Sequence, residues 1–329
     1  MSDAPHRETF LDVRDLRVGF QRHGVRATAV QGVSFSMAPG EILGLVGESG
    51  CGKSLTAKAI MGLTGRKRGE FVEGRVRLQG RNLLALPEPD LQALRGSRMA
   101  MIFQDPSTSL NPVFTIGNQI AEVPRIHAGA SRQAAWAEAL TALQSVGIAP
   151  ATERARQFPF EFSGGMRQRA VIAMGLAGHP ELLIADEPTT ALDVTIQAQI
   201  LDLLRDLRAR LGCAILFITH DLAVVASFCD RVAVMYAGRI VEEAPVQTIF
   251  SAPRHPYTEG LLRSVPTLES EGRLEPIPGQ PPDLDRMPAE GCPFRERCPL
   301  AEARCSEAMP PLIGPGAHRV ACWKREVAS

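Results

Sequence analysis

A glycine-rich loop separates an apolar run from a predicted helix near the start of the chain. The apolar run, Ile42 to Val46, is typical of a strand buried on both faces of a sheet. Leu55 to Leu63 follows the loop and has a helical pattern. The loop itself has the sequence Gly47-Glu48-Ser49-Gly50-Cys51-Gly52-Lys53-Ser54. It fits G-x-x-x-x-G-K-[ST], so this strand, loop and helix predict a P-loop that binds the phosphates of a nucleotide.

The chemistry of such a loop follows from its residue types. Glycines let backbone N–H groups wrap phosphate oxygens where a Cβ atom would obstruct them. Lys53 adds a positive charge for the β- and γ-phosphates, and Ser54 offers a hydroxyl to Mg²⁺. Cys51 stands at the N-terminus of the predicted helix, a position that lowers the pKa of a thiol, so we expect alkylation there to block nucleotide binding.

Two acidic residues, Asp186 and Glu187, end a second apolar run, Leu182 to Ala185. An apolar strand that ends in Asp-Glu is common and means little alone. In the same chain as a P-loop, and in this order, it indicates a Walker B strand. Asp186 is then expected to hold Mg²⁺ and Glu187 to polarise the attacking water.

Two further polar residues follow predicted strands. Gln104 comes after Met99 to Phe103, and His220 comes after Ala214 to Thr219. The ends of parallel strands are where α/β sheets place their ligands, so both side chains could reach the γ-phosphate or its water, and Gln104 could contact Mg²⁺. Taken singly, each is better explained as a satisfied surface or turn residue, and only the other motifs in the chain favour a role at the nucleotide.

A second anion site is predicted around residue 163. Ser163 is a good N-cap, Gly164 and Gly165 leave the first N–H groups of a helix uncovered, and Arg167 to Gly178 continues as that helix. A helix N-terminus attracts phosphate through its free N–H groups and its dipole. The simpler alternative is an ordinary capped helix.

Strands alternate with helices over most of the chain, which predicts an α/β fold with a mainly parallel sheet covered on both faces. Between about residues 105 and 170 two helical patterns, Ile116 to His127 and Ser131 to Val146, predict a helical insert. After about residue 250 the chain becomes proline-rich and loses long periodic segments. We expect this tail to be an appendage held by its cysteines and not by a large core.

Charge and hydropathy limit the function classes. The 329 residues include 36 Lys and Arg and 36 Asp and Glu, and this balance argues against a broad nucleic-acid surface. No apolar run approaches the roughly 18 residues that span a bilayer. The first residues lack the apolar core of a signal peptide. The chain is therefore expected to be cytoplasmic, with any membrane role peripheral.

Four of the seven cysteines crowd the tail with the spacing C-x5-C-x6-C-x16-C. In a cytoplasmic chain such crowding indicates metal ligation before disulfides. Four thiolates suit either Zn²⁺ or an iron–sulfur cluster, and four reduced thiols in a loop remain the simple alternative. These cysteines are Cys292, Cys298, Cys305 and Cys322.

Taken together, these motifs resemble the ABC-type ATPases over roughly residues 8–250. The resemblance assigns the Walker A, Q-loop, signature, Walker B, D-loop and switch-histidine positions to Gly47 to Ser54, Gln104, Ser163-Gly164-Gly165, Asp186-Glu187, Ala191-Leu192-Asp193 and His220. It implies a P-loop ATPase core with an antiparallel β subdomain and a helical subdomain near 105–170. It also implies that Phe20 stacks on adenine and that Asp193 lies at the nucleotide; a core role for Phe20 is nearly as plausible.

Further segments resemble the dipeptide/oligopeptide importer branch of these ATPases. They are Ala100 to Pro106, Thr108 to Pro112, Phe162 to Met166, Asp186 to Gln197, His255-Pro256-Tyr257-Thr258, and residues 251–329 as a C-terminal extension. The branch implies ATP and Mg²⁺ as ligands, and a 4Fe-4S cluster in preference to zinc on the four tail cysteines. Met166 departs from the general pattern, which has glutamine there, so only Ser163 and backbone N–H groups are expected to bind phosphate.

The resemblance also implies partners. A second, related ATPase chain would close head-to-tail on ATP, two membrane permeases would bind the helical insert, and an extracytoplasmic solute-binding protein would deliver di- or oligopeptides. Nickel chelates and oligosaccharides are alternative cargoes. Two other function classes are a nucleic-acid repair or translation ATPase and a regulatory ATPase whose tail binds a partner. The first usually shows two cassettes, a coiled coil or a basic surface; neither class would co-purify with permeases.

Overall fold

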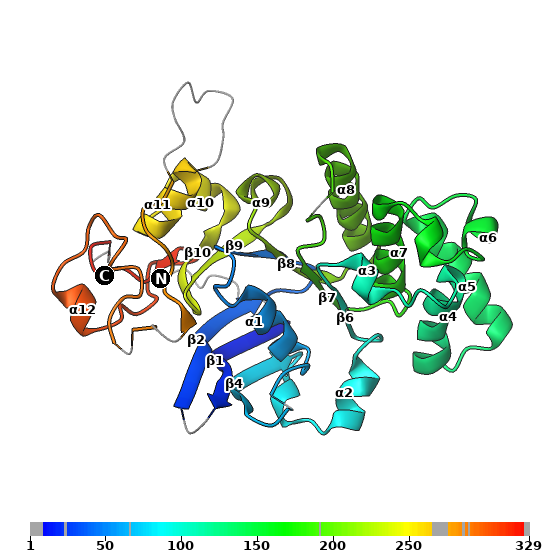
Figure 1. The fold of residues 1–329 in the computed structure, drawn as a ribbon, viewed down its shortest axis with the longest axis horizontal. Helices are drawn as coiled ribbons and strands as arrows, with labels where there is room; N and C mark the ends of the chain where they lie inside the picture. Colours follow the sequence, from blue (N-terminus) through cyan, green and yellow to red (C-terminus); the bar gives the residue numbers. More distant parts are fainter. Residues whose placement is uncertain are drawn as a thin grey trace, which may run out of the picture. The chain divides into compact units, whose positions relative to one another are not determined.

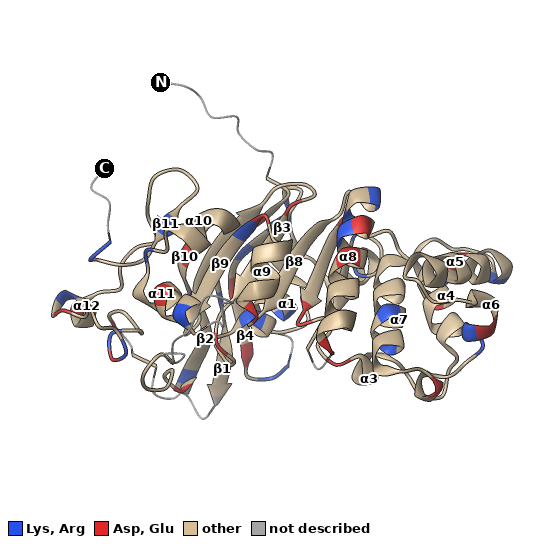
Figure 2. Cartoon of the chain, turned by 90° about the horizontal axis from the view of Figure 1, so that it is seen from above, with Lys and Arg blue, Asp and Glu red and all other residues tan. Residues whose placement is uncertain are grey.

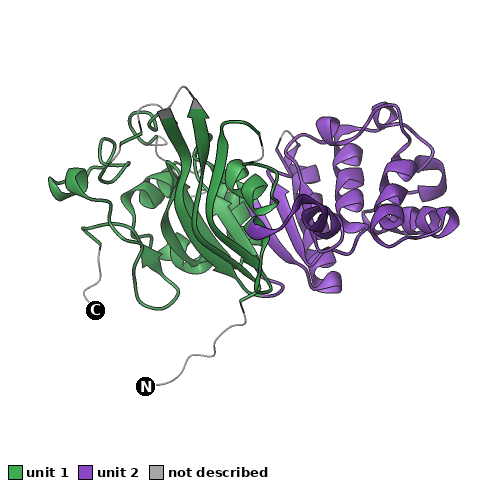
Figure 3. Cartoon of the chain, turned by 90° about the horizontal axis from the view of Figure 1, so that it is seen from below, with its two compact units in different colours: residues 1–38, 42–84, 218–329 green, residues 39–41, 85–217 purple. Residues whose placement is uncertain are grey.

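The computed structural model describes residues 9–22, 25–65, 67–190, 192–264, 276–284, 287–288 and 290–325. They fall into two compact units (Figure 3). Unit 1 consists of residues 1–38, 42–84 and 218–329. Unit 2 consists of residues 39–41 and 85–217. The chain passes from unit 2 into unit 1 within one strand, β8 (Ala214–Thr219), whose six residues are all buried.

The antiparallel subdomain lies in unit 1 (Figure 1). Its order is β2-β1-β4-β5, and Val18 pairs with Val30 on one side and with Val72 on the other. Apolar side chains that alternate along the strands bury one face, including Val18, Val30 and Phe35. The strands are β1 (Leu11–Arg22), β2 (Val25–Met37), β4 (Glu70–Leu78) and β5 (Arg81–Asn82).

Unit 1 also contains the strand that leads into the P-loop. β3 (Ile42–Val46) is buried throughout and pairs in parallel with β9 (Arg231–Tyr236). β10 (Arg239–Pro245) continues the sheet antiparallel to β9, and β11 (Arg319–Val320) from the tail pairs antiparallel with β10. The helices of this unit are α1 (Lys53–Ile60), α9 (Leu222–Phe228), α10 (Val246–Ser251), α11 (Pro256–Arg263) and α12 (Arg304–Glu307).

Unit 2 combines parallel strands with a helical part. β6 (Met99–Ile102) pairs in parallel with β7 (Leu182–Asp186), and β8 is the neighbour of β7. Short helices α2 (Glu88–Leu94) and α3 (Pro106–Ser109) flank β6, and α8 (Val194–Leu211) separates β7 from β8. The helical part consists of α4 (Ile116–His127), α5 (Arg132–Ser145), α6 (Ala151–Arg154) and α7 (Gly164–Leu176).

The structure confirms the predicted α/β fold and most predicted elements within one to three residues. β3, α4 and β8 have the predicted bounds, and α7 begins at Gly164, directly after the predicted N-cap Ser163. The strand β1 is long, Leu11–Arg22, and it pairs with two neighbours, β2 and β4. Figure 2 shows acidic and basic residues distributed over the elements of each unit.

In the residues that the structure describes, the tail is held by more than its cysteines. Phe294, Val320 and Ala321 are almost fully buried, and β11 extends the sheet of unit 1. Arg319 also makes an ion pair with the buried carboxylate of Glu243, and His318 makes a hydrogen bond with that of Glu242. The tail is therefore part of the core of unit 1. None of the described helices is long and apolar enough to cross a membrane.

Candidate functional site

The backbone of the P-loop requires its glycines. A Cβ on Gly47 would lie 2.1 Å from the carbonyl oxygen of Met235, so no larger residue fits there without a shift of β9. Gly52 has φ +105°, a left-handed conformation that favours glycine, and it precedes the first residue of α1. The loop thus turns sharply from β3 into α1 and directs the N-terminus of the helix toward the loop.

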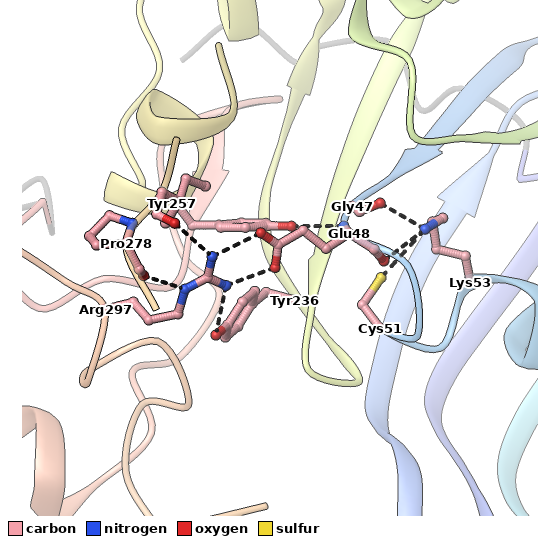
Figure 4. Close-up of polar contacts among 9 residues, drawn as sticks. Gly47, Glu48, Cys51, Lys53, Tyr236, Tyr257, Pro278 and Arg297 are labelled. Atoms are coloured by element: carbon pink, nitrogen blue, oxygen red, sulfur yellow. Dashed lines mark hydrogen bonds and ion pairs between the residues drawn. The ribbon is translucent and has the colours of Figure 1, made fainter. Parts of the chain in front are cut away.

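Lys53 is buried with only 5% of its surface exposed. Its Nζ donates to the carbonyl oxygens of Gly47 at 2.7 Å and Glu48 at 3.0 Å, and lies 3.8 Å from Sγ of Cys51. These contacts hold the ammonium group inside the curve of the loop (Figure 4). The predicted phosphate-binding residues Gly47 to Ser54 therefore form one local structure in unit 1.

Glu48 is contacted by residues far away in the sequence. Its backbone N–H donates to the hydroxyl of Tyr257 at 2.9 Å. Its carboxylate accepts two hydrogen bonds from the guanidinium of Arg297, at 2.7 Å from Nη1 and 2.9 Å from Nη2 (Figure 4). A two-pronged pair of this kind is among the stronger charge-assisted interactions.

Arg297 is itself fixed by further contacts. Nε donates to the carbonyl oxygen of Pro278 at 2.9 Å, and Nη1 lies 3.4 Å from the hydroxyl of Tyr236. The hydrogen bond with Glu48 is the main cause that raises the pKa of Arg297, so the guanidinium stays charged. Burial raises the pKa of Tyr257, so its hydroxyl stays protonated.

The structure contradicts the low pKa expected for the thiol of Cys51. The side chain is buried, and burial raises the pKa of its thiol. Lys53 acts in the opposite direction but does not outweigh the loss of solvation. The sequence placed Cys51 correctly at the start of a helix, but it did not reveal that the loop encloses the sulfur.

The acidic end of β7 lies in unit 2. Asp186 is buried, with 3% exposed, and Glu187 follows it with φ +48°. A non-glycine residue in this conformation carries strain that is often found at functional sites. Oε2 of Glu187 accepts hydrogen bonds from Gln104 Nε2 at 3.1 Å and from Thr190 Oγ1 at 2.8 Å. The two predicted residues Gln104 and Glu187 are thus brought together, and Thr190 is an additional partner that the sequence did not indicate.

Asp193 and His220 occupy the two turns after β7 and β8. Asp193 is the N-cap of α8, and its side chain accepts from the N–H of Ile196 at 2.9 Å. His220 lies in unit 1 between β8 and α9, whose N-cap is Asp221. Ala191, the first residue of the expected D-loop, lies outside the described residues.

The second predicted anion site is a capped helix N-terminus in unit 2. The Ser163 hydroxyl accepts from the N–H of Met166 at 3.3 Å, which confirms the predicted N-cap. A Cβ on Gly164 would meet nothing within 4 Å, whereas one on Gly165 would lie 3.0 Å from Ile196. Nη1 of Arg167 donates to the carbonyl oxygen of Phe162. Phe162 and Ile196 also belong to unit 2.

Phe20 lies on β1 in unit 1 and is 40% exposed. The alternative of a core phenylalanine is therefore wrong, and the ring is available for stacking. The exposed Phe20 and the P-loop both belong to unit 1, while Gln104, Asp186, Glu187, Asp193 and the helix N-terminus at Ser163 to Gly165 belong to unit 2.

The four tail cysteines line one small cavity in unit 1, of about 20 Å³, together with His255, Phe294 and Trp323. Burial raises the pKa of Cys292 to about 11 and raises that of Cys298 and Cys322. Among the described residues, no group of three or more His, Cys, Asp or Glu is arranged to hold a single metal ion. The cysteines thus converge on a cavity without meeting at one point.

The sequence did not identify Tyr257 and Arg297 as neighbours of the P-loop. The motif His255-Pro256-Tyr257-Thr258 was noticed only as part of a family pattern, and Arg297 carried no signal. Arg297 and Glu48 are 249 residues apart in the chain, so no local spacing connects them. Only the three-dimensional fold shows that Arg297 is a partner of Glu48.

Two family models match the sequence. The model described as "ABC transporter" matches residues 30–190. The model described as "Oligopeptide/dipeptide transporter, C-terminal region" matches residues 241–305. The second match covers α11 and the first three tail cysteines, so the tail is similar to a known extension of this kind of ATPase.

Curated relatives match almost the whole chain. A "probable peptide ABC transporter ATP-binding protein" of Sinorhizobium fredii is 54% identical over 98% of this chain and 97% of its own length. The oligopeptide transport ATP-binding protein OppD of Bacillus subtilis is 52% identical over 95% of this chain and 88% of its own length. The dipeptide transport ATP-binding protein DppD of the same organism is 48% identical over 97% and 96%.

A solved structure agrees with these relatives. An ATP-binding cassette determined as a dimer after hydrolysis, with ADP and phosphate bound, has a TM-score of 0.64 and 26% identity. It covers 72% of this chain and 98% of its own. The motifs, the fold and these relatives lead to one conclusion: the chain belongs to the ABC transporter ATP-binding proteins, in the oligopeptide/dipeptide branch.

Proposed function

We propose that this chain binds and hydrolyses ATP to drive the import of di- or oligopeptides through an ABC transporter. The observation that carries the proposal is the presence in one chain of an ABC cassette and the C-terminal region of oligopeptide/dipeptide transporters. Relatives at about half identity over nearly the full length are named for peptide transport, which supports peptides before nickel chelates or oligosaccharides.

The residues suggest a division of roles. Lys53 and the N–H groups of the P-loop bind phosphates, and the hydroxyl of Ser54 with the carboxylate of Asp186 suits the oxygen preference of Mg²⁺. Glu187 polarises the attacking water. Gln104 donates a hydrogen bond to the carboxylate of Glu187 and so orients that carboxylate. Mg²⁺ would supply neutralisation of phosphate charge. His220 adds a polar contact near the γ-phosphate, and Phe20 stacks on adenine.

The Ser163 site completes the nucleotide site of another chain in this proposal. Its open Gly164 and its local support suit a surface that receives a phosphate from outside the chain. Asp193, in the loop after Glu187, lies at the same nucleotide. The partner is a second, related ATPase chain; the solved relative with 26% identity is itself a dimer. Two permeases in the inner membrane and an extracytoplasmic solute-binding protein complete the assembly, with this chain on the cytoplasmic side.

A reconstituted complex tests the cargo. The chain, its paired ATPase and the permeases are placed in lipid vesicles with the solute-binding protein, and ATP hydrolysis is measured with peptides of defined length, a nickel chelate and an oligosaccharide. Stimulation by peptides alone is expected. Stimulation by one of the other solutes would contradict the peptide assignment, and failure of the chain to co-purify with permeases would contradict transport itself.

We further propose that the four tail cysteines hold a 4Fe-4S cluster. Their side chains line one cavity in unit 1, which supports a shared cofactor. Four thiolates are the ligand set of a 4Fe-4S cluster, and the resemblance to the importer branch favours the cluster over zinc. The cluster would supply a covalent link between distant parts of the tail.

Metal content after purification without oxygen tests this cluster. We expect about four iron atoms per chain and visible absorbance, with loss of iron in Cys298→Ser but not in the control Cys213→Ser, which changes a cysteine outside the tail. Stoichiometric zinc without iron would contradict the proposal, as would iron bound equally well by Cys298→Ser.

A further inference from the structure

We propose that Arg297, on the segment between the first two tail cysteines, is a positioning residue for the P-loop: it holds Glu48, and through Glu48 it sets the affinity of the P-loop for ATP. The inference deepens the proposed function and rests on it. It assigns to the C-terminal extension a direct part in nucleotide binding by the same chain.

The first step of the argument concerns Glu48, all of whose hydrogen-bonding groups are in use. The carboxylate accepts from Arg297, the backbone N–H donates to Tyr257, and the backbone carbonyl accepts from Lys53. The tail and the phosphate-binding lysine therefore meet on one residue. A displacement of Glu48 changes the position of a carbonyl that helps to hold the Lys53 ammonium group.

The second step concerns the environment of the ion pair. The Arg297 side chain is 5% exposed and that of Glu48 is 26% exposed. Removal of one partner of such a pair leaves a poorly solvated charge, which is costlier than loss of a surface pair. Without Arg297, Glu48 would turn toward water, and a carboxylate that moves freely beside a phosphate site repels the ligand.

The third step concerns the rigidity of the segment that carries Arg297. Its ends are Cys292 and Cys298, which line the same cavity. Between them, Phe294 packs against Tyr236 with ring centroids 5.2 Å apart and against Tyr257 at 5.4 Å. The backbone N–H of Cys292 donates to the carbonyl oxygen of Cys305 at 2.7 Å. The backbone that carries Arg297 is therefore fixed by packing, and this limits the movement of the guanidinium.

Equilibrium binding of MgATP to the full-length chain tests the proposal. Arg297→Ala is expected to raise the Kd for MgATP at least about fivefold, the lower range for energetic coupling between sites. Arg297→Lys keeps the charge but loses the planar fork, so it should give a smaller increase. In a double-mutant cycle with Glu48→Gln, the combined variant should bind more tightly than the sum of the two single effects predicts.

Arg319→Ala is the matched control. Arg319 also comes from the tail and pairs with a buried carboxylate, but its partner is Glu243 on β10, whereas the partner of Arg297 is Glu48 in the P-loop. The Kd of the Arg319→Ala variant for MgATP should stay within about twofold of the Kd of the unsubstituted chain, even if the melting temperature of the variant falls. An equal loss of affinity in Arg319→Ala would show that general destabilisation explains the result and would overturn the proposal.

The remaining outcomes are also decisive. A folded Arg297→Ala chain with unchanged Kd would overturn the positioning role. If that variant does not fold, unchanged affinities in both Arg297→Lys and Glu48→Gln would overturn it instead. Failure of the unchanged chain to bind MgATP would refute the proposed function, and this result is distinct from any difference between variants.

Discussion

The two predicted phosphate sites are built in opposite ways. The P-loop in unit 1 is enclosed: Met235 crowds Gly47, Tyr257 and Arg297 hold Glu48, and all these partners lie more than 180 residues further along the chain. The N-terminus of α7 in unit 2 is open at Gly164 and is capped by Ser163, its own neighbour in sequence. An enclosed loop suits a site that its own chain completes, and an open one suits a site that awaits another surface.

Lys53→Ala tests the enclosed site and should give the largest effect. It removes a buried ammonium from the curve of the loop, and we expect ATP affinity to fall about a hundredfold, the loss typical of a preorganised charge stabiliser. Equilibrium binding to the isolated full-length chain measures this. Unchanged affinity would mean that the enclosed loop is not the chain's own nucleotide site.

Ser163→Arg tests the open site. The bulky charged side chain should block a phosphate brought by another chain, so hydrolysis by the assembled complex should fall at least about tenfold. ATP binding by the isolated chain should change by less than about twofold, because Ser163 belongs to unit 2 and the P-loop belongs to unit 1. Ser163→Thr, which keeps a capping hydroxyl at the same position, serves as the control. Parallel loss of binding and hydrolysis would break the distinction between the two sites.

Alkylation of Cys51 sharpens the description of the enclosed site. Because the thiol is buried and burial raises its pKa, N-ethylmaleimide at neutral pH should modify Cys51 at least about tenfold more slowly than a free thiol. Mass spectrometry of the labelled peptides over time gives the rate at Cys51, with a cysteine-containing peptide added to the same reaction as the free-thiol reference. Rapid labelling of Cys51 with loss of ATP binding would favour an open loop.

The smallest expected effect concerns pH. Burial lowers the pKa of His255 to about 3, and its Nδ1 accepts from the N–H of Tyr257 at the start of α11. An unfolded histidine takes up its proton near pH 6.5, so the unfolded state binds more protons between about pH 6.5 and 3. Stability contributed by neutral His255 is therefore present above pH 6.5 and decreases as pH falls, by up to about 1.4 kcal/mol per pH unit.

His255→Asn checks this slope by chemical unfolding at several pH values. Asparagine offers an oxygen in place of Nδ1 and does not titrate, so stability should depend less on pH than in the unchanged chain. The hydroxyl of Tyr257 accepts a hydrogen bond from the N–H of Glu48, so His255 is connected through Tyr257 to the enclosed P-loop. Equal slopes for both proteins would assign the acid sensitivity to other groups.

The sequence was sufficient for the elements and motifs that depend on neighbours along the chain. Apolar runs such as Ile42 to Val46, the glycine pattern before Lys53 and the cap at Ser163 are local signals, and the structure has them. The low pKa expected for Cys51 failed because enclosure by the fold is not a local property. Arg297 was missed for the same reason, since a contact across 249 residues leaves no periodic trace.

The short strand β11 has a practical consequence for shortened versions of this protein. Its pairing with β10 covers backbone groups that would otherwise form an open sheet edge. A chain cut after the cassette, near residue 250, would lose this cover and leave the carboxylates of Glu242 and Glu243 without His318 and Arg319. Such a fragment is expected to self-associate through exposed strands and to be degraded in cells, so an isolated cassette is a poor substitute for the whole chain.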